Sequence, residues 1–276
     1  MSWFSEVFLK EKVIIASIYL PPLPGSPEYH RGTSLSKIID YTRSELIALQ
    51  EEGMDGISIG NQQDWPYQIG VGPETSALIT RIVSEASIGL TIPIGITVFW
   101  DDMTAIAIAK ATGAKFVRGV FRGAYAGEMG LLNLNAAKFL RFRKEIDAED
   151  VKLIFMLRPI LGKSLIEQDL VSEVKNCIWG SKPDALTLCG PIPGKSPTMD
   201  ELELVTANSK GCPILMNNGA TLENITKVLK VCDGAVVATH LRRGKKSSNS
   251  FDKDKVREFM NIVEKYRNSL SASINY

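Results

Sequence analysis

The chain has 276 residues, 45% of them hydrophobic, and its 32 lysine and arginine residues almost balance 31 aspartate and glutamate residues, for a net charge of +1. This length accommodates one large α/β barrel or two small domains, with enough apolar residues for a core that needs no disulfide or metal. The balanced charge argues against a strongly basic nucleic-acid-binding protein and against an acidic disordered chain. We therefore expect no nucleic-acid partner.

Cysteine and histidine residues are few and dispersed. The four cysteines form no C-x-x-C pair, and only His30 and His240 are available to join them. This usage argues against a structural zinc site or a secreted disulfide framework and suits a reducing cytosol, so a cytoplasmic protein is expected. The start of the chain lacks the features of a signal peptide, and no apolar run approaches the roughly 20 residues of a membrane-spanning helix. We expect no transmembrane segment.

Eight short apolar runs recur along the chain, each followed by a stretch with helical periodicity. They are nearly continuous in apolar character rather than alternating, which is typical of parallel strands covered on both faces. The predicted strands, in chain order, are Val13–Tyr19, Gly56–Gly60, Pro93–Phe99, Lys115–Val120, Lys152–Leu157, Asp184–Leu188, Pro213–Asn217 and Gly234–Thr239.

The stretches between these runs carry helix boundary signals. A helix over Ser36–Glu52 ends at Gly53, and Pro73 is suited to the first turn of the next helix. A third helix over Ala105–Thr112 ends at Gly113, Thr221 offers a hydroxyl cap to another, and Asp252–Arg267 forms the last. These elements alternate strictly with the predicted strands.

This alternation predicts an α/β fold made of a single (β/α)₈ TIM barrel over residues 1–276, with an extension at 1–12 and the final helix at 252–267. The rival architecture is a doubly wound sheet, which has a glycine-rich turn after its first strand. Here that turn is Leu20-Pro-Pro-Leu-Pro-Gly25, which is unsuited to holding a pyrophosphate. No Pro/Gly/Ser-rich linker divides the chain, so one domain is expected.

In a TIM barrel the active site lies at the carboxyl ends of the strands. Charged and polar residues concentrate there in this sequence, and they form two groups of candidates. Those for acid/base work or charge stabilisation are Asp64, Asp102, Arg118, Arg158 and His240. Those for binding a phosphate or another ligand are Asn61, Gly190, Asn217, Asn218, Gly219, Thr239 and Arg242.

Several of these positions have a second interpretation. Asp101 and Asp102 are able to hold a divalent metal through oxygen ligands, but Asp102 is equally suited to capping the helix that follows, so no cofactor is firmly implied. Gly190–Ser196 is one residue short of a nucleotide P-loop and contains two prolines, which lack the N–H donors of a phosphate cradle. Phe121–Gly130 is interpreted either as a lid over the site or as a flexible surface connection.

The order of several motifs resembles the BtpA family over about residues 12–262. The opening Ile18-Tyr-Leu-Pro-Pro-Leu-Pro-Gly-Ser-Pro27 is similar to that family's H-L-P-P-L-P-G-S-P, and Val71-Gly-Pro-Glu-Thr75 to its V-G-P-E-T. Asn218-Gly-Ala-Thr221 and Val237-Ala-Thr239 resemble its S-G-V-T and V-G-T segments. The resemblance implies a barrel of the ribulose-phosphate-binding type with a phosphate near Gly219 and Thr239. Family members are named for photosystem I biogenesis or as nucleosidase-like or isomerase-like proteins.

The chain departs from the family pattern at several site positions. Gly60 stands where the family has glutamate, and Leu157-Arg-Pro159 replaces its K-H-A. Two hypotheses follow. The first is an enzyme acting on a small phosphorylated metabolite, a sugar or nucleoside phosphate, which is an isomerase, lyase or nucleosidase and assembles as a homo-oligomer. The alternative is a non-catalytic assembly factor that binds a protein partner, to which the apolar residues Trp3, Phe4 and Phe8 would contribute.

Overall fold

A computed structural model describes residues 3–192 and 195–274 of the protein. Eight parallel strands form a closed barrel in the order β1-β11-β10-β9-β7-β4-β3-β2, with β1 and β11 closing the ring at Val13 and Gly234. The strands are β1 (Val13–Tyr19), β2 (Gly56–Gly60), β3 (Ile94–Thr97), β4 (Phe116–Gly119), β7 (Lys152–Leu157), β9 (Ala185–Cys189), β10 (Ile214–Asn217) and β11 (Gly234–Val237). The predicted TIM barrel is confirmed, and each predicted strand falls within a residue or two of an observed one.

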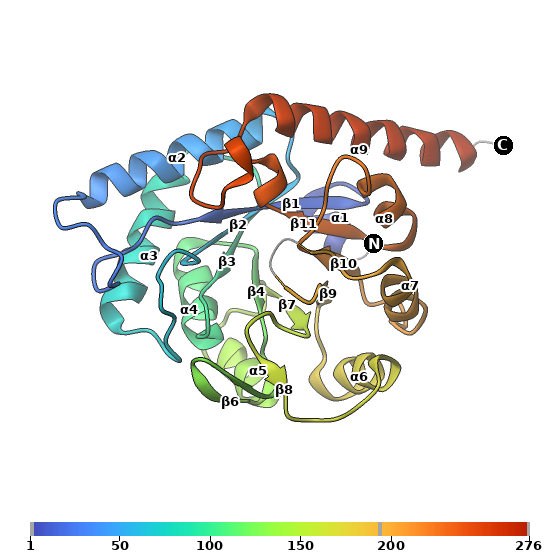
Figure 1. Cartoon of the computed structure of the whole chain (residues 1–276), viewed down its shortest axis with the longest axis horizontal. Helices are drawn as coiled ribbons and strands as arrows, with labels where there is room; N and C mark the ends of the chain where they lie inside the picture. The colour runs from blue at the N-terminus through green and yellow to red at the C-terminus, as the bar shows by residue number, and fades with distance from the viewer. Residues whose placement is uncertain (1–2, 193–194, 275–276) are drawn as a thin grey trace.

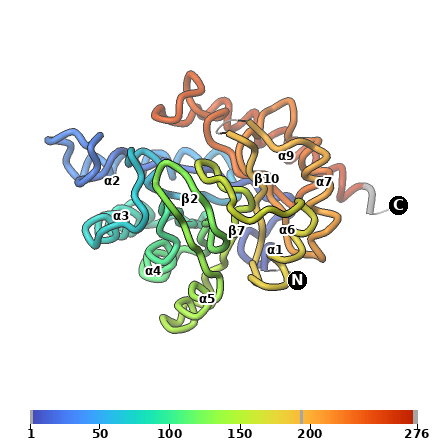
Figure 2. Tube along the Cα trace, turned by 60° about the horizontal axis from the view of Figure 1, so that its bottom comes forward, coloured from blue at the N-terminus to red at the C-terminus, as the bar shows by residue number. Residues whose placement is uncertain are grey.

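The helices surround this barrel (Figure 1), and α2, α3, α4 and α5 follow one another along one side (Figure 2). They are α2 (Leu35–Glu51), α3 (Pro73–Ala86), α4 (Asp102–Thr112), α5 (Ala136–Glu145), α6 (Leu170–Asn176), α7 (Met199–Ala207), α8 (Ile225–Val231) and α9 (Lys253–Ile274). Their apolar faces pack on the outward-facing residues of the strands, such as Ile14, Val117 and Phe155, in one continuous core. No helix among the described residues is long and apolar enough to cross a membrane.

Local capping explains where the helices begin. The Ser34 side chain accepts a hydrogen bond from the Lys37 amide, and Pro73 occupies the first turn of α3. Three predicted boundaries were wrong, one of them the end of α9, which extends to Ile274 rather than Arg267. Helix α4 begins at Asp102 rather than Ala105, because the Asp101 side chain caps it. Helix α8 begins at Ile225 rather than Thr221, because the intervening residues form a turn in which Asn224 accepts a bond from the Thr221 amide.

The segment after β4, interpreted above as a lid or a flexible connection, has regular secondary structure. It folds into an antiparallel hairpin of β5 (Gly123–Gly127) and β6 (Gly130–Leu134), and β8 (Lys163–Ser164) pairs with β5 on its other edge. Tyr125 and Leu132 from this small sheet pack against Trp100 and Met156. The hairpin therefore adds a wall beside the carboxyl ends of β3 and β7.

A short helix closes the opposite end of the barrel. In α1 (Trp3–Phe8), Phe4 and Phe8 are buried against inward-facing strand residues, and the Phe8 ring lies 5.6 Å from that of Phe116. The Trp3 indole donates a hydrogen bond to the Asp184 carbonyl. These apolar side chains thus fill the bottom of the barrel, and Phe4 and Phe8 are not exposed to a partner.

Candidate active site

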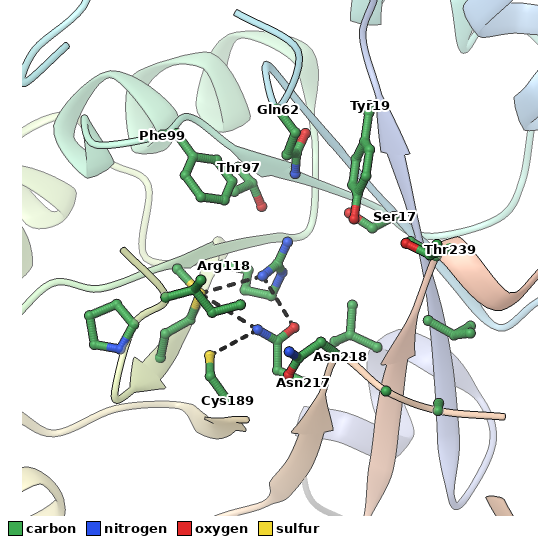
Figure 3. Close-up of a pocket in the computed structure, with 18 of the residues that line it drawn as sticks. Ser17, Tyr19, Gln62, Thr97, Phe99, Arg118, Cys189, Asn217, Asn218 and Thr239 are labelled. Atoms are coloured by element: carbon green, nitrogen blue, oxygen red, sulfur yellow. Dashed lines mark hydrogen bonds between the residues drawn. The ribbon is translucent and has the colours of Figure 1, made fainter. Parts of the chain in front are cut away.

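A cavity of about 340 Å³ lies at the carboxyl ends of the barrel strands. It has the size and the apolar walls with a few polar groups that are typical of small-molecule sites. Figure 3 shows side chains from strands all around the ring pointing into it. Seven of the twelve predicted site residues line this cavity, namely Asp102, Arg118, Asn217, Asn218, Gly219, Thr239 and His240.

Asp102 is the acid of the cavity. Its Oδ2 accepts hydrogen bonds from the backbone amides of Val120 and Phe121, at 3.1 and 2.9 Å, whereas its Oδ1 has no hydrogen-bond partner among the described residues. Burial raises the pKa of this carboxyl to about 7, despite the two amide bonds that favour the charged form. The neighbouring Asp101 caps α4, so the two adjacent carboxyls have different roles. A carboxyl that titrates near neutrality is suited to both accepting and donating a proton.

Arg118 forms the floor of the cavity. It projects from β4 between β3 and β7, and only 5% of the residue is exposed. Its Nη1 contacts two neutral groups, the Asn217 side-chain oxygen at 3.3 Å and the Met156 sulfur at 3.4 Å. Asn217 in turn donates to the Cys189 sulfur at 3.0 Å (Figure 3). Burial lowers the pKa of the guanidinium and raises that of the Cys189 thiol, so the thiol is not an activated nucleophile.

The loops after β9 and β10 are held together by close backbone contacts. The Asn218 side chain accepts from the Gly190 amide at 2.9 Å and donates to the Ile192 carbonyl at 3.0 Å. Gly219 has a φ of +75°, and a Cβ there would lie 2.3 Å from the Ser196 amide nitrogen. Gly190 does not line the cavity, and it allows the Lys195 carbonyl to approach. Glycine at 190 thus shapes the loop rather than contacting a ligand, and Pro193 and Gly194 of the P-loop-like segment lie outside the described residues.

On the β11 side, Thr239, His240 and Lys245 line the cavity. The His240 Nε2 faces the Leu222 amide at 3.4 Å, and burial together with the Lys245 charge lowers the pKa of the imidazole. His240 is therefore neutral at pH 7, with the proton on Nδ1 if Nε2 accepts from Leu222. Lys245 brings a positive charge to this rim of the cavity.

Asn61 and Asp64 line a smaller cavity of about 160 Å³ that shares Phe99 with the main one. The Asn61 side chain accepts a bond from the Phe99 amide, and Asp64 accepts one from the Leu23 amide at 2.8 Å. Burial raises the pKa of the Asp64 carboxyl. These contacts hold the loops after β1, β2 and β3 together. Asn61 and Asp64 therefore stabilise the wall of the main cavity and do not line its interior.

Two predicted arginines lie away from both cavities. Arg158 adopts a left-handed backbone conformation that turns its side chain outward, where it pairs with Glu173 and Glu201 at 3.3 and 3.2 Å. Arg242 is fully buried behind β1 and donates to the Ser17 carbonyl at 3.0 Å, with Glu45 3.8 Å away. Both guanidinium groups form ion pairs with glutamates away from the cavities, so neither residue belongs to the candidate site.

Sequence reasoning missed several polar residues that line the cavity. Ser17 and Tyr19 lie on β1 and Thr97 on β3, inside runs whose apolar character alone marked them as strands. A polar residue within such a run, near its carboxyl end, is the signal that could have identified them. Gln62 follows β2 and was not selected, although its buried side chain lines the cavity.

No cluster of three or more histidine, cysteine or acidic side chains able to hold a metal occurs within residues 3–192 and 195–274. Both oxygens of Asp101, the residue considered with Asp102 for such a site, are engaged by Thr104 and the Val71 amide. The Asp101 carboxylate is thus committed to holding α4 and the loop before α3 in place.

A closed parallel barrel with a cavity at the carboxyl ends of its strands defines the TIM-barrel class. Within that class the chain belongs to the BtpA family, whose family model matches residues 10–265. It is 34% identical to the sgc region protein SgcQ of Escherichia coli K12, over 97% of this chain and 100% of that protein. It is 31% identical to the photosystem I biogenesis protein BtpA of a Synechocystis strain, over 94% and 90% of the two chains.

Solved structures of other proteins share the fold at low sequence identity. The (S)-3-O-geranylgeranylglyceryl phosphate synthase of Thermoplasma acidophilum, solved with sn-glycerol-1-phosphate, has a TM-score of 0.61 at 12% identity, covering 96% of this chain and 99% of that one. The phosphoribosyl anthranilate isomerase of Thermococcus kodakaraensis has a TM-score of 0.55 at 16% identity, covering 92% and 99%. At these identities the likeness extends to the fold alone.

Proposed function

We propose that this protein is an enzyme that acts on a small phosphorylated metabolite, a sugar or nucleoside phosphate, by acid/base chemistry in the main cavity. The observation that carries the proposal is Asp102, which is 7% exposed and has a pKa raised to about 7, and whose Oδ1 accepts no hydrogen bond from the described residues. Burying an ionisable carboxyl costs stability, and perturbed acids in cavities are characteristic of catalytic sites. Asp102 accepts a proton from the substrate and returns it at another position or to the leaving atom.

The phosphate is assigned to the loops after β10 and β11. Gly219 and Thr239 line that side of the cavity, and Lys245 supplies a positive charge there. Loops at these two strands commonly hold phosphate in TIM barrels, and the synthase and isomerase with the same fold act on phosphorylated compounds by their names. The neutral His240 beside Lys245 donates a hydrogen bond rather than a charge.

The alternative, a non-catalytic assembly factor, rested partly on apolar residues near the start of the chain. Phe4 and Phe8 fill the bottom of the barrel, so they give that alternative no support. Its remaining basis is the name of the Synechocystis relative and the departures from the family pattern at Gly60 and Leu157-Arg-Pro159. Recovery of the chain from its native lysate as a homo-oligomer, without another protein, would agree with the enzyme, and a stoichiometric protein partner would favour the alternative.

Enzymatic turnover is detectable by NMR whatever product forms. The protein is incubated in D₂O with a panel of sugar and nucleoside phosphates, and the spectra follow both product formation and exchange of substrate C–H protons. Asp102→Asn is expected to slow the reaction or exchange by about 10²–10⁴-fold, the range found for a general acid or base. A panel in which no compound changes in the presence of the wild-type protein would contradict the proposal.

Phosphate binding is tested separately by calorimetry with a pair of matched variants. Lys245→Met removes the charge that lines the cavity, whereas Lys246→Met removes the exposed neighbouring charge outside it. Weaker binding of every phosphorylated compound in Lys245→Met, with Lys246→Met unchanged, is the expected result. Equal affinities in the two variants would move the phosphate away from this loop.

A further inference from the structure

Arg118 is a buried cation with no counter-charge among the residues that the structure describes. No carboxylate of the described residues lies within 4.0 Å of its guanidinium, and its Nε, also buried, has no hydrogen-bond partner there. The two other buried arginines differ in this respect, since Arg242 lies 3.8 Å from Glu45 and Arg267 lies 2.5 Å from Asp55. A buried charge that no opposite charge compensates is costly, and an anionic group of a bound ligand would offset that cost.

Two further side chains of the cavity also lack partners. The Ser17 hydroxyl and both amide atoms of Gln62 are buried with no hydrogen bond to any described residue, and the two residues are 2% and 8% exposed. Figure 3 shows both side chains pointing toward the same space above Arg118. A guanidinium, an amide N–H and a hydroxyl that converge on one space form a set of donors for an oxyanion.

The charge and shape of this space favour a carboxylate over a phosphate. A single guanidinium compensates one negative charge, whereas a phosphate monoester carries about 1.5 to 2 charges at pH 7. The planar fork of arginine matches the planar carboxylate. The surroundings are apolar and closely packed, with Val120, Met156 and Val236 all lining the cavity and nearly fully buried.

We propose that Arg118, Ser17 and Gln62 form a subsite for a carboxylate, so that the substrate carries a carboxylate deep in the barrel and a phosphate at the loops after β10 and β11. The phosphate half of this statement rests on the proposed function, whereas the carboxylate half rests on the three unpartnered groups. In the ring of strands β4 lies directly opposite β11. The two negative groups of such a substrate therefore span the cavity, with Asp102 at the β3 and β4 side between the loops.

The test uses pairs of compounds that differ only in this group. Sorbitol 6-phosphate has a hydroxymethyl group where 6-phosphogluconate has its carboxylate, and glycerol 3-phosphate differs from 3-phosphoglycerate in the same way. By calorimetry we expect the carboxylate member of at least one pair to bind about tenfold or more tightly than its partner, the effect of hydrogen bonds to a charged group. We expect this preference to be lost in Arg118→Met and reduced in Gln62→Leu. The second variant retains Arg118, so it tests the subsite even if Arg118→Met does not fold.

The outcomes separate the two proposals. Equal binding within both pairs, or a preference that persists in Arg118→Met, overturns the carboxylate subsite and leaves the proposed function standing. If no phosphorylated compound binds, the proposed function fails, and pyruvate then tests the subsite alone by thermal denaturation. Pyruvate that stabilises the wild-type protein but not Arg118→Met supports the subsite, and pyruvate without effect on the wild-type protein overturns it.

Discussion

The buried Asp102 makes the stability of the fold depend on pH in a way that one substitution removes. Its pKa is about 7 in the folded protein, compared with 3.8 for an unperturbed aspartate, because burial disfavours the charged form. Between these two values the folded chain keeps a proton that the unfolded chain has lost. Folding is therefore progressively disfavoured as the pH rises from about 4 to about 7, and this penalty is complete above the folded pKa.

The size of the penalty follows from the pKa difference. Three units correspond to about 4 kcal/mol when the carboxyl is fully ionised, and about 2 to 3 kcal/mol of this develops between pH 5 and pH 8. Asp102→Asn has no charge to bury, and its side-chain oxygen still accepts from the Val120 and Phe121 amides. Relative to the wild-type protein, this variant should gain about 2 to 3 kcal/mol of stability from pH 5 to pH 8.

Urea denaturation followed by circular dichroism at pH 5, 6, 7 and 8 measures this difference. Asp200→Asn is the matched control, because it removes an exposed carboxyl and reports the background effect of losing one acid. A gap between Asp102→Asn and the wild-type protein that stays constant across this range would show that Asp102 is ionised in the fold throughout. The acid/base role proposed for it would then lose its physical basis.

Three further predictions concern the framework around the site. Phe8→Ala should destabilise the fold by about 3–5 kcal/mol in urea denaturation, since Phe8 is 4% exposed at the barrel bottom; a loss below about 1 kcal/mol would mean that the bottom is open. Arg242→Met should cost about 3–5 kcal/mol because it leaves Glu45 buried without its cation, and Glu45→Gln should restore part of the loss; additive losses would contradict this pairing. Burial raises the pKa of all four thiols, those of Cys177, Cys189, Cys212 and Cys232. None should therefore react rapidly with Ellman's reagent at pH 8 in the native protein, whereas all should react in urea.

Much of the candidate site follows from one general rule, that TIM barrels bind ligands where their strands end. That rule places Asn217, Gly219 and Thr239 in the cavity, as observed. It does not separate Arg118 from Arg158, since both lie at strand ends in sequence. Arg118 shares the inward-facing side of β4 with Phe116, whereas Arg158 follows β7 in a left-handed conformation and reaches two glutamates on the outside.

The same distinction applies to neighbouring acids. Asp101 and Asp102 are equivalent by composition, yet one caps α4 and the other turns toward the cavity, because successive residues at a helix start point in different directions. Ser17 stands within an apolar run and Gln62 follows one, but no feature of the sequence shows that their side chains lack hydrogen-bond partners among the described residues. Their importance lies in having no partner, which is a property of the surrounding packing.

The order and type of the strands were determined by sequence alone, because continuous apolar runs and helix caps act over a few residues at a time. Which charges remain uncompensated was decided only by the tertiary structure. Glu45 reaches Arg242 and Asp55 reaches Arg267 across 197 and 212 residues of chain, while Arg118 is left with neutral neighbours. Electrostatic pairing depends on distance in space, and the closure of the ring sets those distances.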